Sequence, residues 1–223
     1  KSPSKNLGIL CRGKSLNSLN KFVDKFDKCF IVNDFKKEID EFENILIKKE
    51  IIHFVSRVSK VSLKLKQYKK FKIKFIQMSV DFSIFDYQFM KCYLKYKLFN
   101  LDVNFTPSSF LNNLYLKSFS KFKGLDDHPN YKSKFPNTGL LSIFYAAEYL
   151  DVKNIFICGL DFYTADYVFR SRRANPLEVQ HQKFLDLDLI NFFLNFIKEK
   201  KDINFYLLTN YKFSQKPDNL ILL

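Results

Sequence analysis

Short apolar runs alternate along this chain with segments in which apolar residues recur at helical spacing. Such runs predict buried strands, and they lie at Leu7–Cys11, Lys28–Val32, Glu50–Ser56, Phe71–Met78, Asn154–Cys158 and Asn204–Thr209. The helical spacing predicts helices that begin at Leu16, with Ser15 as N-cap, and others at 35–48, 83–99, 138–150 and 182–198. Residues 101–136 are turn-rich and predict irregular structure. The alternation predicts one α/β domain over residues 1–223, with a Rossmann-like, mostly parallel sheet and helices on both faces.

Ligands of such a sheet bind beyond the carboxyl ends of its strands. The residues that follow the predicted strands are polar, and they are Arg12-Gly13-Lys14-Ser15, Asn33, Ser56-Arg57 and Gly159–Tyr163. Asn137-Thr138-Gly139 joins them because it opens a helix, whose N-terminal N–H groups suit an anion. No Rossmann glycine motif and no P-loop is present. Dinucleotide binding and P-loop phosphoryl transfer are therefore disfavoured.

The segment after the strand at 154–158 combines several features of an active site. The strand opens into Gly159–Tyr163, a polar loop follows, and a histidine, His181, stands at the start of an amphipathic segment. An imidazole titrates near neutrality and can serve as a general base, although a surface or helix-capping histidine is the alternative. The loop carries a basic cluster that either binds an anionic acceptor or lipid headgroup or is solvated, namely Arg170, Arg172 and Arg173.

Charge changes this picture only in part. The net charge is +14, which attracts nucleic acid, anionic lipid or phosphorylated substrates, or simply solubilises the chain. Basic residues cluster in Lys60–Lys74, which fits an interfacial or solvated face better than a pocket. No RNA-binding aromatic motif, helix-turn-helix signal or zinc spacing is present, so a nucleic-acid partner is not expected.

Cysteine and histidine usage argues against a metal site. The 4 cysteines lack metal-ligand spacing, and Cys11, Cys29 and Cys158 lie in or beside apolar runs, which predicts buried free thiols in a reducing cytoplasm. Asp186 and Asp188 fall within a predicted helix, where residues two apart do not share a face. His53 lies inside an apolar strand and predicts a structural role. No stretch is long and apolar enough to span a bilayer, and no signal peptide is visible.

Taken in order, the polar segments resemble motifs of the bacterial sialyltransferase family typified by the Campylobacter lipooligosaccharide enzymes (glycosyltransferase family 42). Members carry Asn-Gly-Pro-Ser-Leu after the first strand, Cys-Asn after the second, Thr-Ser-Gly before a helix, Ser-Gly-Ile-Asp-Phe-Tyr at a later strand, and a histidine five residues ahead of an aspartate. The matching segments here are Arg12–Leu16, Val32-Asn33, Asn137–Gly139, Cys158–Tyr163, and His181 with Asp186. The matches extend from residue 7 to about residue 195, and 57–130 matches poorly.

The resemblance implies a modified GT-A fold, a CMP-activated nonulosonic acid donor, inversion at the anomeric carbon, and no metal or cofactor. It implies that His181 is the general base and that Tyr163 and Tyr167 hydrogen-bond the departing phosphate. By sequence alone, a functional role and no special role are equally expected for each of these tyrosines, because the chain is rich in tyrosine. Further implied roles concern the donor site (Arg12, Gly13, Ser15, Asn33, Asn137, Thr138, Gly159 and Asp161, and more weakly Ser56), in which Asp161 is expected to brace the loop, and a mobile lid (164–180).

Departures from the family pattern concern the donor. Arg12 stands where members have asparagine; its guanidinium could pair with the phosphate or the donor carboxylate, or it could mean an altered or lost donor. Phe135 stands where relatives have a basic residue, and the lid is shorter, so acceptor choice should differ.

The sequence therefore predicts a cytoplasmic, inverting, metal-independent glycosyltransferase that moves sialic acid or a related nonulosonic acid from CMP to a glycan hydroxyl of a cell-surface polysaccharide or lipooligosaccharide. A homo-oligomer and peripheral association with the anionic inner membrane face are compatible with it. The alternatives are a pterin pyrophosphokinase-like or flagellin-associated enzyme of related fold, and a basic nucleic-acid- or membrane-binding module.

Overall fold

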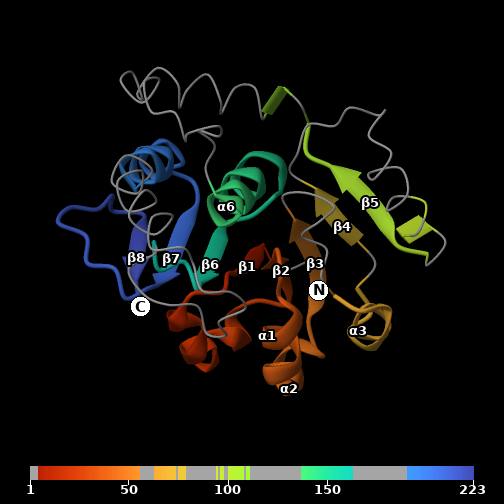
Figure 1. Cartoon of the computed structure of the whole chain (residues 1–223). Coiled ribbons are helices and arrows are strands. Elements are labelled where there is room, and N and C mark those ends of the chain that lie inside the picture. The colour runs from red at the N-terminus through yellow and green to blue at the C-terminus, as the bar shows by residue number, and fades with distance from the viewer. Residues whose placement is uncertain are drawn as a thin grey trace, which may run out of the picture.

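A computed structural model describes residues 5–55, 63–73, 75–78, 94, 96–97, 100–107, 109–110, 137–162 and 190–223. Its centre is a parallel sheet of 8 strands in the order β5-β4-β3-β2-β1-β6-β7-β8 (Figure 1). The strands are β1 (Asn6–Leu10), β2 (Lys28–Val32), β3 (Glu50–Val55), β4 (Phe75–Met78), β5 (Asp102–Phe105), β6 (Asn154–Cys158), β7 (Asn204–Leu208) and β8 (Leu220–Leu222). All seven described pairings are parallel, so the predicted Rossmann-like α/β class is confirmed.

Helices cover both faces of the sheet, as Figure 1 shows. One face carries α6 (Thr138–Tyr149) and the helical residues 190–199. The other face carries two 3-10 helices and three short α-helices, namely η1 (Lys14–Lys21), η2 (Val23–Lys25), α1 (Lys36–Glu41), α2 (Glu43–Leu46) and α3 (Leu65–Lys70). Among the described ranges, no helix is long and apolar enough to cross a membrane.

Two separate hydrophobic cores result from the alternation of side chains along the buried strands. In β1, Leu7 and Ile9 join the core beneath α6, whereas Leu10 joins the core beneath η1 and α1. In β6, Ile155 and Ile157 likewise join the core beneath α6, whereas the residues that alternate with them join the other core. Strands with both faces buried read as continuous apolar runs, which is why sequence alone located them.

The order of the strands creates a switch point beside β1. From β1 the chain builds outward through β2, β3, β4 and β5, and it then returns to place β6 on the other side of β1. Connections from β1 and β6 therefore leave the sheet in opposite directions, and a crevice opens between their carboxyl ends. The candidate site lies there.

Several predicted elements were wrong in detail. The segment after β1 is the 3-10 helix η1, with Gly13 as N-cap and no side-chain cap, so Ser15 is not an N-cap. The helix predicted at 35–48 is broken at Phe42, which ends α1 and begins α2. A strand predicted to begin at Phe71 begins at Phe75, because α3 and its terminal turn occupy residues 65–72.

Two strands were missed by the sequence analysis. β5 lies within the segment predicted as irregular, and β8 follows the strand that was predicted to be the last. Only parts of the helices predicted at 83–99 and 182–198 lie within the described residues, where 94, 96–97 and 190–199 are helical. The three predicted thiols, Cys11, Cys29 and Cys158, are buried and free as expected.

Candidate functional site

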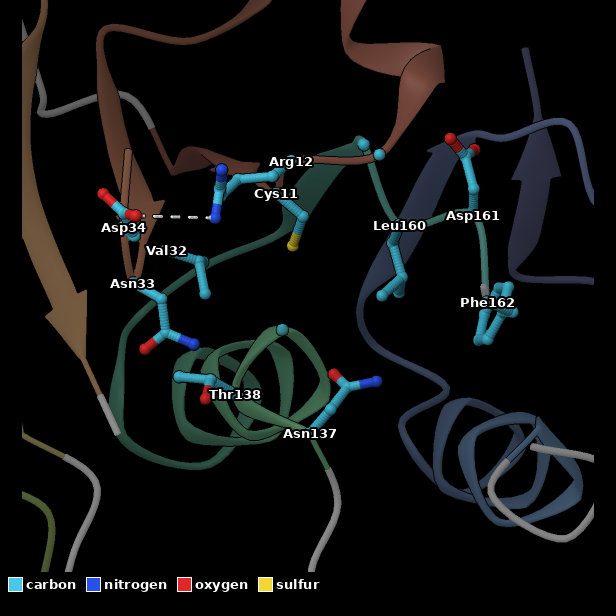
Figure 2. A pocket seen from close by; sticks show the side chains of 13 residues that line it. Cys11, Arg12, Val32, Asn33, Asp34, Asn137, Thr138, Leu160, Asp161 and Phe162 are labelled. Carbon is cyan, nitrogen blue, oxygen red and sulfur yellow. Dashed lines mark ion pairs between the residues drawn. The ribbon is translucent and has the colours of Figure 1, made fainter. Parts of the chain in front are cut away.

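A pocket of about 180 Å³ lies at the carboxyl ends of β1, β2 and β6 and is closed on one side by the first turn of α6 (Figure 2). Four segments far apart in sequence line it, namely 11–13, 32–34, 137–139 and 159–162. Each of the four overlaps one of the polar segments identified by the sequence analysis. Of the predicted donor-site residues, Arg12, Gly13, Asn33, Asn137, Thr138, Gly159 and Asp161 are brought together here.

Backbone contact between the ends of β1 and β6 forms the floor of the pocket. Cys11 N donates to Cys158 O at 2.7 Å, and Gly13 N donates to Gly159 O at 2.7 Å. Gly159 has φ +75°, and a Cβ added to it would lie 2.3 Å from Cys11 O. A Cβ on Gly13 would lie 2.5 Å from Gly159 O. The two glycines therefore permit an approach that no residue with a side chain could make.

Asp161 ties together the segments that follow β1, β6 and β7. Its side chain is 3% exposed; Oδ2 accepts from Ser15 N at 2.9 Å, and Oδ1 accepts from Thr209 Oγ1 at 3.3 Å and from Asn210 N at 3.2 Å. A carboxylate with several N–H and O–H donors is a strong fixed anchor. These contacts are those of a brace, the role expected for Asp161.

Ser15 has a different place from the one expected. Its hydroxyl accepts from Gly159 N at 3.1 Å, and its carbonyl accepts from Cys158 Sγ at 3.4 Å. The side chain is buried and is not among the residues that line the described pocket. Ser15 therefore supports the floor of the site from beneath.

Arg12 lines the pocket with its guanidinium already engaged by carboxylates. Its Nε donates to Glu38 Oε1 at 2.8 Å, and its Nη1 lies 3.9 Å from Asp34 Oδ2 (Figure 2). Glu38 is 0% exposed, and within the described part of the chain its Oε2 has no hydrogen-bond partner. A buried carboxylate requires a counter-charge. Arg12 therefore stabilises Glu38 beside the pocket, whether or not it also contacts a ligand.

Asn33 ends β2 in the left-handed region, with φ +55°. Its carbonyl oxygen is 2.5 Å from His53 Nε2, and His53 Nδ1 is 2.8 Å from Tyr68 Oη. In Figure 2 the Asn33 amide extends toward the first turn of α6. Asparagine adopts this conformation more readily than most residues, and the buried histidine beside it fixes the carbonyl in place.

The first turn of α6 provides the clearest anion-binding group of the pocket. Asn137 caps the helix, since its Oδ1 accepts from Leu140 N at 3.0 Å, and its carbonyl accepts from Leu141 N at 3.0 Å. The preceding N–H groups, those of Thr138 and Gly139, have no partner within the helix, and both residues line the pocket. The helix dipole favours negative charge at this end.

Phe162 lines the pocket and has an unusual backbone conformation. Its φ is +46°, which is a true outlier for a bulky residue. The ring is 4% exposed and packs on Phe193, Tyr211 and Phe213. This packing holds the strained residue that directly precedes Tyr163, the first of the predicted phosphate-binding tyrosines.

The predicted catalytic residues lie outside the described residues, and so do Ser56, Phe135 and the lid. These catalytic and lid residues are Tyr163, Tyr167, His181, Arg170, Arg172 and Arg173, with the lid at 164–180. Where the structure does describe the chain, no three His, Cys, Asp or Glu side chains are grouped closely enough to hold a metal ion.

Three residues near the site were not identified as functional from sequence. Asp34 lines the pocket directly, Glu38 pairs with Arg12, and Tyr68 anchors His53. Glu38 offered a signal, because a carboxylate between Phe35 and Phe42 on an apolar helical stripe requires a buried cation. Tyr68 offered no such signal, because lysines dominate the sequence of the helix that carries it and it shows no apolar stripe.

Burial of His53 makes the stability of the protein depend on pH. Burial lowers the pKa of His53 from 6.5 to about 4, against the opposing effects of the Asn33 carbonyl and Asp34. Between these values the unfolded chain binds the additional proton, so the free energy of unfolding falls as pH falls. We expect His53 to contribute a loss of about 2 kcal/mol between about pH 7.5 and pH 5.

Urea unfolding of the wild type and of His53→Gln at both pH values measures this contribution. The loss on acidification should be smaller in the variant by about 2 kcal/mol, because other groups titrate equally in both proteins. An equal loss in the two proteins would contradict the assignment of a neutral, buried imidazole.

Comparison with known proteins adds no relative. No protein-family model matches the chain, and no curated protein or solved structure matches it either.

Proposed function

We propose that this chain is an inverting glycosyltransferase that transfers a nonulosonic acid, such as sialic acid, from a CMP-linked donor to a glycan hydroxyl without a metal ion. One observation carries the proposal: the four segments that resemble the family's donor-site motifs line a single pocket, although they are distributed from residue 11 to residue 162. Segments that follow parallel strands share one edge of a sheet in any case; the support is that the segments with donor-site residue types, in the family's order, are the ones that line the pocket.

The chemistry of the pocket suits the donor. A nonulosonic acid carries a carboxylate, and Thr138 and Gly139, in the first turn of α6, line the pocket; carboxylates bind well at such a helix N-terminus. Asn33 and Asn137 present amide groups that can both donate and accept, as hydroxyl-rich sugars and nucleosides require. Because Arg12 is paired with Glu38, backbone and amide groups supply most of the recognition in this account.

The proposed reaction is a single displacement. His181 removes the proton from the acceptor hydroxyl as its oxygen attacks the anomeric carbon. The bond between that carbon and the phosphate oxygen of CMP breaks, and CMP leaves with the electron pair. Hydrogen bonds from Tyr163 and Tyr167 stabilise the charge that develops on the phosphate. The loop at 164–180 covers the donor and limits its hydrolysis by water.

The lysines of α3 are suited to a peripheral position on an anionic membrane. Lys64, Lys66, Lys69 and Lys70 are exposed, while Gln67 and Tyr68 face inward. An acceptor glycan carried by a membrane lipid would then reach the enzyme from the cytoplasmic side. The enzyme would then act in the cytoplasm, at the inner face of the membrane.

Removal of the proposed base should separate chemistry from binding. His181→Ala should lower the rate of CMP release with a CMP-sialic acid donor and a glycan acceptor by about 10²–10⁴-fold, the range for loss of a general base. The affinity for CMP, measured by calorimetry, should remain within about threefold because the base contacts the acceptor. His128→Ala is the matched control, since it removes another histidine to which no role is assigned.

Retention of full turnover by His181→Ala would remove the base assignment.

A calorimetric series with CMP, UMP, GMP and ATP, with and without Mg²⁺, tests which class of enzyme or binding protein this chain is. Stabilisation by ATP only with Mg²⁺ would favour the pterin pyrophosphokinase-like alternative. Binding to DNA or RNA that weakens steeply with salt would favour the basic binding module.

A further inference from the structure

A buried chain of hydrogen bonds leads from α3 to the pocket. It begins at the hydroxyl of Tyr68, passes through the imidazole of His53 on β3, and ends at the carbonyl oxygen of Asn33, with distances of 2.8 Å and 2.5 Å. His53 is 0% exposed and Tyr68 is 2% exposed. The two rings also lie 5.9 Å apart, centroid to centroid. Only Asn33 reaches the pocket.

The direction of each bond follows from chemistry. A carbonyl oxygen can only accept, so His53 carries its proton on Nε2 and donates it to Asn33. The Nδ1 atom is then an acceptor, and the Tyr68 hydroxyl must donate to it. Burial lowers the pKa of His53 to about 4, which keeps the imidazole in this neutral form at physiological pH. Both ring nitrogens are satisfied without water.

The chain of bonds acts on a residue whose backbone is in an uncommon conformation. Asn33 has φ +55°, and its carbonyl also accepts from Phe35 N at 2.9 Å, while its own N–H donates to Phe54 O at 2.8 Å. Residues in the left-handed region persist where surrounding contacts fix them. This turn directs the Asn33 side chain into the pocket, toward Thr138 (Figure 2).

The Tyr68 end of this series of hydrogen bonds is also held in place. The side chain of Gln67, the neighbour of Tyr68, donates to Lys36 O at 2.9 Å and to Asp40 Oδ1 at 3.0 Å, and it accepts from Lys64 N at 2.9 Å. These bonds hold α3 against α1. The hydroxyl of Tyr68 therefore has a defined position from which to orient the imidazole.

We propose that His53 and Tyr68 are positioning residues for the pocket, which hold Asn33 in its left-handed turn so that its amide meets the bound ligand. They touch no ligand themselves. For the identity of that ligand, CMP or its sugar, the proposal rests on the proposed function; for the geometry of Asn33 it does not. A buried polar group with a purely structural role needs only a hydrogen-bond partner. His53 and Tyr68 do more than satisfy each other, because their hydrogen bonds connect α3 to Asn33 at the edge of the pocket.

Two substitutions at His53 separate the positioning role from a general loss of packing. His53→Gln can place an amide N–H where Nε2–H was, so it can still donate to Asn33. His53→Asn places its amide near the former Nδ1, so it can reach Tyr68 but not Asn33. Both variants lose the ring, and both should lower the unfolding temperature. Only His53→Asn should lose the hydrogen bond to the Asn33 carbonyl, which would then keep the bond from Phe35 N.

Crystal structures of the two variants without ligand give the first readout. Asn33 should remain left-handed, with its side chain in the pocket, in His53→Gln, and it should leave that conformation in His53→Asn. Calorimetry with CMP gives the second, where affinity should fall by about tenfold or more in His53→Asn and stay within about threefold in His53→Gln. In an Asn33→Gly background, which removes the amide, the two variants should bind CMP equally.

An unchanged Asn33 in both crystal structures would overturn the proposal, as would equal CMP affinities of the two variants with Asn33 present. Failure of the wild type to bind CMP would overturn the proposed function instead. In that case the conformation of Asn33 in the two variants still decides the positioning role.

Discussion

Gly159→Ala should leave little folded protein. The residue has φ +75°, and the new Cβ would lie 2.3 Å from Cys11 O and 2.6 Å from Cys11 C. Backbone atoms at the end of a central strand cannot yield as a side chain can. Relief of the clash would separate the ends of β1 and β6 and break the bond from Gly13 N to Gly159 O. We expect a loss of at least about 4 kcal/mol, which few single substitutions cause, measured by urea unfolding of any soluble product.

Gly139→Ala is the matched control in the same pocket. Its Cβ would approach Cys11 Sγ at 2.9 Å, Asn137 Oδ1 at 3.2 Å and Leu160 Cδ1 at 3.2 Å, all of them side-chain rather than backbone atoms, and alanine favours the helix. The stability of this variant should fall by about 1–3 kcal/mol, the usual cost of overpacking, and by less than that of Gly159→Ala. Equal stability of the two variants would contradict the described contact between β1 and β6.

Arg12→Ala should destabilise the protein by about 3–5 kcal/mol, because it leaves Glu38 buried without its counter-charge. The Arg12 side chain is 13% exposed and that of Glu38 is 0% exposed, so water cannot readily replace the guanidinium. Urea unfolding measures the loss. A double variant, Arg12→Met with Glu38→Leu, removes both charges and should recover most of the stability.

This pair of variants also decides what Arg12 contributes to the ligand. If Arg12 serves only Glu38, the double variant should bind CMP with nearly wild-type affinity. If the guanidinium also contacts the phosphate or the donor carboxylate, the double variant should be stable yet bind more weakly. A stability of Arg12→Ala close to that of the wild type would contradict the buried ion pair itself.

The central strands could be predicted from sequence because both faces of each are buried. β1, β2, β3 and β6 read as predominantly apolar runs, and their bounds were placed within a residue. β5 and β8 lie at the two edges of the sheet, and β5 is largely exposed. An edge strand needs fewer apolar residues, so its pattern merges with that of the adjoining loops.

Helices on the η1 side were harder to predict, because tertiary contacts decided their form. The apolar spacing from Leu16 was read correctly, but the segment is a 3-10 helix that already begins at Lys14. The Ser15 hydroxyl, which an N-cap would use to accept from a helix N–H, accepts from Gly159 N instead. α3 shows lysines on its exposed side, and only Gln67 and Tyr68 reveal its inner face.

Within the pocket, the strand-end rule found most residues and missed their supports. It identified Arg12, Asn33 and Asp161 because polar residues after buried strands share one edge of the sheet. The rule does not predict which residues support those that line the pocket. The partners Glu38, His53 and Tyr68 lie on other elements, and their contacts depend on how helices dock, which no spacing along the chain encodes.

The most direct test of the account is a crystal structure of the protein with CMP or an unreactive CMP-sialic acid analogue. The ligand should occupy the pocket between the ends of β1 and β6, with its anionic groups at the N–H groups of Thr138 and Gly139 and with Asn33 in contact. A ligand found elsewhere on the protein, or a pocket that stays empty at saturating CMP, would contradict the proposed donor site.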